Sequence, residues 1–86
     1  MGVIEDMGDA LARDVIAAMV ELDDERLPDK IARVLLDASP TMQEAFLTAY
    51  RVRVAEKRGR EFLGKLLTAK REGKEGPKLH MESGGH

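Results

Sequence analysis

Residues 41–71 read TMQEAFLTAYRVRVAEKRGREFLGKLLTAKR, and this stretch decides the fold. It contains no proline and predicts one long helix. At ~100° per residue, one apolar stripe follows the whole length of that helix. The stripe comprises Ala45, Ala49, Val52, Gly59, Leu63 and Leu66, with Met42 and Leu67 beside them.

The two halves of this helix differ on the side opposite the stripe. Before Ala55 that side is apolar as well, with Phe46, Leu47 and Tyr50. A helix that is apolar all round is usually buried all round, so the first half is expected to be core. After Ala55 the same side becomes charged, which predicts a second half that is apolar on one face only.

Two shorter helices are expected before it. Residues 3–22 place apolar side chains at alternating steps of three and four, the pattern of an amphipathic bundle helix. The face consists of Ile4, Met7, Leu11, Val15, Ala18 and Leu22. Pro28 suits the first turn of a second helix, over 28–38. Ser39 before Pro40 is a start signal for the third helix, and Thr41 with Glu44 is a competing capping box.

The predicted fold is therefore all-α: a helical hairpin or three-helix unit with helices at about 3–22, 28–38 and 41–71. Residues 1–72 are expected to form a single domain. Residues 73–86 are rich in glycine with little apolar content, and they predict a disordered tail.

Composition excludes several function classes. The 86 residues contain no cysteine, which rules out disulfides and cysteine-based zinc sites and favours a cytoplasmic location. No apolar run is long enough to span a membrane. Both histidines fall in the tail, and the sequence contains no glycine-rich phosphate loop after a strand and no His-Glu metal-ligand spacing on a helix. We expect a non-enzymatic protein without a cofactor or metal.

Charge is divided unevenly along the chain. Residues 1–44 contain eleven acidic and four basic side chains, whereas residues 45–86 contain ten basic and five acidic ones. Two hypotheses account for this. Helices can pair within one chain, or the acidic first helix of one chain can meet the basic second half of another in a dimer.

The second half of the long helix is the predicted interface. About thirty helical residues span about 45 Å, whereas a monomer of this size has a radius of gyration near 11 Å. Something outside the chain should cover the stripe, so we expect a homodimer and a protein partner. Gly59 on the stripe favours close approach by a second helix, although tolerated sequence variation would also explain it. The predicted contact residues are Val52, Gly59, Phe62, Leu63, Leu66 and Leu67.

Glu56 also lies on the stripe. It can pair with Arg53 or Arg60 of its own helix, or with a base of a partner helix.

Nucleic-acid binding is the alternative function. A cluster of bases could neutralise phosphates, but it lies on both flanks of the helix and the whole chain is acidic. The cluster consists of Arg51, Arg53, Lys57, Arg58 and Arg60.

A third hypothesis comes from a family resemblance. Met7-Gly8-x-x-Leu11, then Glu25-Arg-Leu-Pro28-Asp29-Lys30-Ile31 and Val34-Leu35, resemble the NepR class of small alphaproteobacterial anti-sigma factors. The resemblance covers about a third of the chain, the first helix is about one turn longer than in that class, and the long third helix has no counterpart there. It implies an anti-sigma-like factor whose first two helices clamp a transcription protein.

Overall fold

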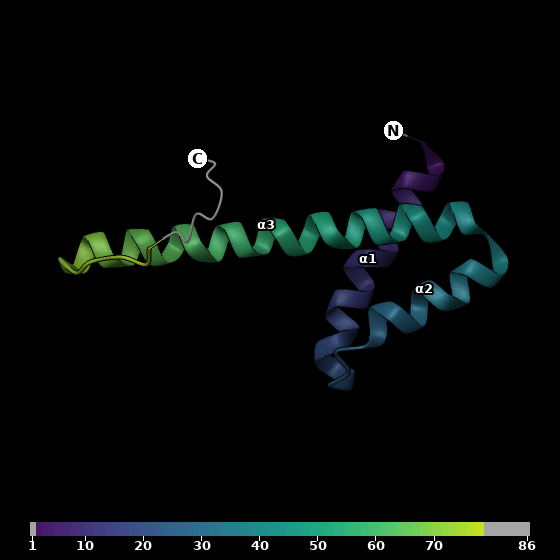
Figure 1. Ribbon diagram of the computed structural model, residues 1–86, viewed down its shortest axis with the longest axis horizontal. Coiled ribbons are helices and arrows are strands. Elements are labelled where there is room, and N and C mark those ends of the chain that lie inside the picture. Colours follow the sequence, from purple (N-terminus) through teal and green to yellow (C-terminus); the bar gives the residue numbers. More distant parts are fainter. Residues whose placement is uncertain (1, 79–86) are drawn as a thin grey trace. The chain divides into compact units, whose positions relative to one another are not determined.

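The computed structural model describes residues 2–78, which fold into three helices and contain no strand (Figure 1). Helix α1 spans Val3–Leu22, α2 spans Leu27–Ala38 and α3 spans Pro40–Glu72. These bounds differ from the expected ranges by at most one residue at each end, and the all-α fold class is confirmed. The predicted tail is non-helical from Gly73 to Lys78, and its last part, 79–86, lies outside the described residues.

The chain divides into two compact units, residues 1–55 and 56–86. Helix α3 begins in the first unit and ends in the second. The boundary follows Ala55, the residue after which the side opposite the stripe becomes charged. The expectation of a single domain over 1–72 stays a prediction.

In the first unit, Asp23 and Asp24 close the end of α1. Asp23 takes a left-handed conformation with φ 51°, and the Asp24 N–H donates to the Met19 carbonyl at 3.0 Å. This is the usual way in which an α-helix stops, although glycine is the common residue there. The Asp24 carboxylate then accepts from the Arg26 N–H at 2.9 Å and from Lys30 Nζ at 2.8 Å, which ties the turn to the start of α2.

Ser39 joins α2 to α3 without a loop. Its N–H donates to the Leu35 carbonyl at 2.7 Å and ends α2. Its Oγ accepts from the Met42 N–H at 3.2 Å, so the same residue is the N-cap of α3. Pro40 follows at the first helical position, where its missing N–H costs nothing. Of the two predicted start signals, Ser39-Pro40 is the one that the structure uses.

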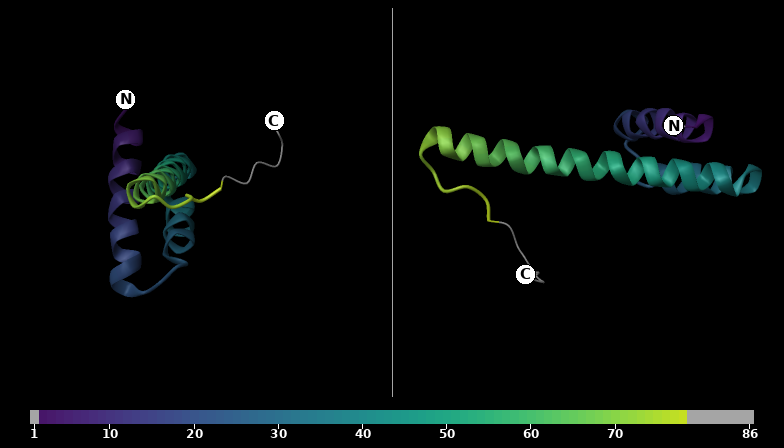
Figure 2. Two further views of the ribbon diagram at one scale, coloured as in Figure 1. Left: turned by 90° about the vertical axis from the view of Figure 1, so that its left-hand side faces the viewer. Right: turned by 90° about the horizontal axis from the view of Figure 1, so that it is seen from above.

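All three helices supply the core of the first unit, since the first part of α3 lies beside both α1 and α2 (Figure 2). Phe46 of α3 is fully buried, and its ring stacks on Tyr50 with centroids 6.2 Å apart. Around it lie small residues of the other helices: Ala12, Val15 and Ala32.

The buried face of α1 differs from the predicted one. Val15 is buried as expected, but Ile4 and Met7 are exposed, whereas Gly8 and Ala12 are buried. The reason is the closeness of α3. A Cβ added at Gly8 would lie 2.8 Å from the Ala45 carbonyl carbon. Small residues therefore form the contact, and the larger side chains are displaced from it.

The first half of α3 is also less buried than expected. Phe46 is buried and Leu47, Ala49 and Tyr50 pack on the core, but Val52 is 61% exposed. The prediction of burial on all sides was wrong, because α1 and α2 cover only part of the circumference.

In the second unit, α3 ends at Gly73 in the same kind of motif as α1. Gly73 has φ 71°, and its N–H donates to the Lys70 carbonyl at 3.2 Å. The Lys74 N–H donates to the Ala69 carbonyl at 2.7 Å. The chain then turns back along the helix. A Cβ added at Gly76 would lie 3.1 Å from Leu66 Cδ2 and 3.5 Å from Ala69 Cβ, so Gly76 packs against both residues.

Candidate protein interface

The C-terminal part of α3 carries large apolar side chains that the chain leaves exposed. Leu63 is 52% exposed, Leu67 43% and Leu66 39%. Between Glu56 and Lys78, Ala69 is the buried residue, and Phe62 is half-buried. We call Gly59, Phe62, Leu63, Leu66 and Leu67 the leucine stripe. The turn at Gly76 packs against Ala69 and one side of Leu66, and Leu63, Leu66 and Leu67 all stay exposed.

Gly59 faces open space in the described part of the chain, because a Cβ placed there meets no atom within 4 Å apart from the nearby backbone of its own helix. A close helix approach does occur within the first unit, at Gly8 against Ala45, and the approach of a partner helix to Gly59 stays a prediction. Glycine lowers helix propensity, so Gly8 near the start of α1 indicates only a cost in the sequence. Only the position of α3 shows its use.

Val52, the sixth predicted interface residue, belongs to the first unit. There it lines a groove of about 510 Å³ between the N-terminal part of α1 and the first half of α3. Apolar residues line this groove together with four carboxylates and two threonines. The lining residues are Ile4, Glu5, Asp6, Asp9, Thr41, Glu44, Ala45, Thr48, Ala49 and Val52. We call it the acidic groove.

The sequence showed the acids near the start of α1 but could not place them opposite α3. The groove was therefore not predicted. A cluster of three acids within five residues was the available signal.

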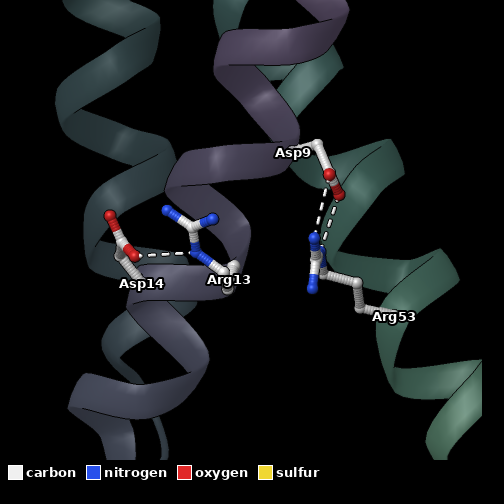
Figure 3. A network of polar contacts seen from close by, with 4 residues as sticks. All are labelled: Asp9, Arg13, Asp14 and Arg53. Atoms are coloured by element: carbon white, nitrogen blue, oxygen red, sulfur yellow. Dashed lines mark hydrogen bonds and ion pairs between the residues drawn. The ribbon is translucent and has the colours of Figure 1, made fainter.

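One wall of the acidic groove is held by an ion pair between α1 and α3. Arg53 Nε donates to Asp9 Oδ1 at 2.6 Å, and Arg53 Nη2 donates to Asp9 Oδ2 at 2.8 Å. The guanidinium group and the carboxylate therefore face each other (Figure 3). The hydrogen bond from Arg53 lowers the pKa of Asp9 below its ordinary value of 3.8. Such a two-point contact fixes geometry as well as adding attraction.

The predicted phosphate-binding bases are thus not equivalent. Arg53 is bound to Asp9 in the first unit, and Arg60 pairs with Glu56 in the second. Within this chain Glu56 therefore pairs with Arg60 of its own helix. Arg51, Lys57 and Arg58 are exposed.

None of the three helices, over residues 2–78, is long and apolar enough to cross a membrane. Comparisons with protein-family models, curated proteins and solved structures found no match to this chain. The resemblance to the NepR class therefore rests on the quoted residues alone.

Proposed function

We propose that this chain is a small non-enzymatic helical interaction protein, a regulator or adaptor, that self-associates through the leucine stripe and binds a protein partner. The exposure of Leu63, Leu66 and Leu67 is the observation that supports the proposal. Full burial of one leucine side chain is worth about 1.5–3 kcal/mol. Leu63, Leu66 and Leu67 are 39–52% exposed, so roughly half of that value per side chain is still available to a helix–helix contact.

The energetics of helix formation lead to the same conclusion. Helices in proteins gain most of their stability from packing an apolar face, since a short helix is marginal in water. From Glu56 to Glu72, α3 has little burial of its own. A second chain on the stripe would supply the missing contact, as oligomerisation does for many small domains.

Other exposed apolar side chains offer a second contact surface for a different protein. Val20 of α1 and Val34 and Leu36 of α2 are exposed in the first unit, outside the leucine stripe. A dimer formed through the stripe would keep them accessible to a partner.

Sedimentation over a concentration series tests the proposal. We expect a concentration-dependent dimer, and Leu63→Asp should weaken self-association at least tenfold because it places a charge in the contact. Thr68→Asp is the matched control, since Thr68 is exposed and lies on another side of the same helix. A chain that stays monomeric throughout, or equal weakening by the two variants, would contradict self-association through the stripe.

A further inference from the structure

The acidic groove is lined by acidic and by apolar side chains. Ile4, Ala45, Ala49 and Val52 supply the apolar part. Its volume of about 510 Å³ falls within the range of sites that accept several side chains of a ligand. It lies entirely within the first unit, between α1 and the first half of α3.

The rim acids are not used equally. Glu5 accepts the N–H of Gly2 at 3.1 Å, and Asp9 is held by Arg53. The carboxylates of Asp6 and Glu44 form no hydrogen bond or ion pair with any described side chain or backbone group. Over residues 2–78, the acids do not gather into a group that could hold a metal ion. The rim therefore offers uncompensated negative charge to a cationic ligand.

The leucine stripe carries the opposite charge at its borders. Lys70 and Arg71 follow Leu66 and Leu67 by four residues each, so they lie next to the stripe on the helix surface. Both belong to the last turn of α3, and neither has an ion pair within the described part of the chain. The leucine stripe is thus an apolar surface bordered by two basic side chains that have no ion pair within the described residues.

We infer that the leucine stripe of one chain occupies the acidic groove of a second copy. The inference rests on the proposed self-association and names the surface that receives the stripe. Leu63, Leu66 and Leu67 would fill the apolar part of the groove, while Lys70 and Arg71 approach Asp6 and Glu44. Opposite potentials on the two faces orient such an encounter and disfavour the contact of one stripe with another.

Each chain carries one groove and one stripe. A reciprocal exchange of stripes between two chains would give a closed dimer with two equal contacts, whereas a non-reciprocal arrangement would extend into chains. A stripe bound to an anionic membrane or to nucleic acid would leave the acidic groove unused. A second copy accounts for both surfaces.

The test uses full-length variants in sedimentation at several concentrations. The groove variant combines Glu44→Lys with Thr48→Arg, both at exposed positions of the groove. Its control combines Ala17→Arg with Glu21→Lys, which makes the same change in charge at exposed positions of α1 outside the groove. We expect the groove variant to weaken self-association at least tenfold and the control less than twofold.

Mixing supplies the decisive arm of the test. The groove variant keeps an intact stripe, and Leu63→Asp keeps an intact groove, so a mixture restores one of the two contacts of the dimer. A heterodimer should therefore form at concentrations at which each variant alone is monomeric. Circular dichroism checks that the variants remain helical. If the double groove variant loses helicity, Glu44→Gln replaces it, with the same direction and a smaller effect.

The outcomes separate the two proposals. If the groove variant self-associates like the unmodified chain, or the mixture stays monomeric, the groove inference is overturned while self-association through the stripe survives. A monomeric unmodified chain overturns both, including the case in which it binds vesicles of anionic lipid or labelled DNA. Weakening by added salt, together with rescue in the mixture, supports the groove contact.

Discussion

The two units of this chain use apolar residues in different ways. In residues 2–55, three helices enclose Phe46, and Gly8 and Ala12 let the backbones approach. In residues 56–78, one helix and the short non-helical segment after it bury Ala69 and leave three leucines exposed. The sequence places an apolar stripe in both regions. What separates them is the number of helices available to cover the apolar face.

The largest expected effect comes from emptying the core of the first unit. Phe46 is fully buried, and Phe46→Ala should lower the free energy of unfolding by about 3–5 kcal/mol. A domain of this size has little more than that to lose. Leu63→Ala, at a half-exposed site of the second unit, should change it by less than about 0.5 kcal/mol in the monomer. Urea unfolding at low protein concentration measures both, and equal losses would erase the contrast between the units.

Two glycines sharpen the comparison. Gly8→Ala should destabilise the chain by about 1 kcal/mol net, because overpacking against the Ala45 backbone outweighs the gain in helix propensity. Gly59→Ala meets nothing within 4 Å and should stabilise α3 by up to about 1 kcal/mol. Thermal unfolding at protein concentrations too low for dimerisation measures both changes. The same sign for the two would show that the α1–α3 approach is looser than described.

The helix ends differ in the residue that takes the left-handed conformation. Asp23→Gly should stabilise the end of α1 or leave it unchanged, whereas Asp23→Ala should cost about 1 kcal/mol. In the second unit Gly73→Ala should cost about the same, but locally, as fraying of the last turn of α3. Global unfolding reports the first position, and amide exchange of residues 69–74 reports the second. A stabilising Gly73→Ala would exclude the described helix end.

The smallest effect concerns pH. The pKa of Asp9 is lower in the folded chain than in the unfolded one, because Arg53 binds the carboxylate. The pair therefore contributes stability above the unfolded pKa, and this contribution disappears as pH falls through the lower folded value. Asp9→Asn should reduce the loss of stability between pH 5 and pH 2 relative to the unmodified chain. Identical acid unfolding profiles would show that the pair is not formed in solution.

Local signals were enough to predict the helices. Ser39-Pro40 and Gly73 bound α3, and Pro28 marks the start of α2, because capping and proline geometry act within a few residues. The buried face of α1 was not predictable in this way. Apolar periodicity favoured Met7, whereas the contact with α3 requires the smaller Gly8 beside it.

The candidate site was predictable only in its second-unit part. Leu63, Leu66 and Leu67 follow from helical periodicity alone. The acidic groove combines Asp6 with Glu44, and the ion pair joins Asp9 to Arg53, across separations that no sequence pattern specifies. Tertiary packing determines both.

Amide hydrogen exchange of the full chain at low and high protein concentration tests the central claim most directly, because it reads the two units separately. We predict that amides of residues 61–70 exchange more slowly as concentration rises, in parallel with dimer formation, while those around Ala12 and Val15 in the core change little. Exchange of residues 61–70 that is fast at every concentration would contradict the claim that a second chain covers the leucine stripe.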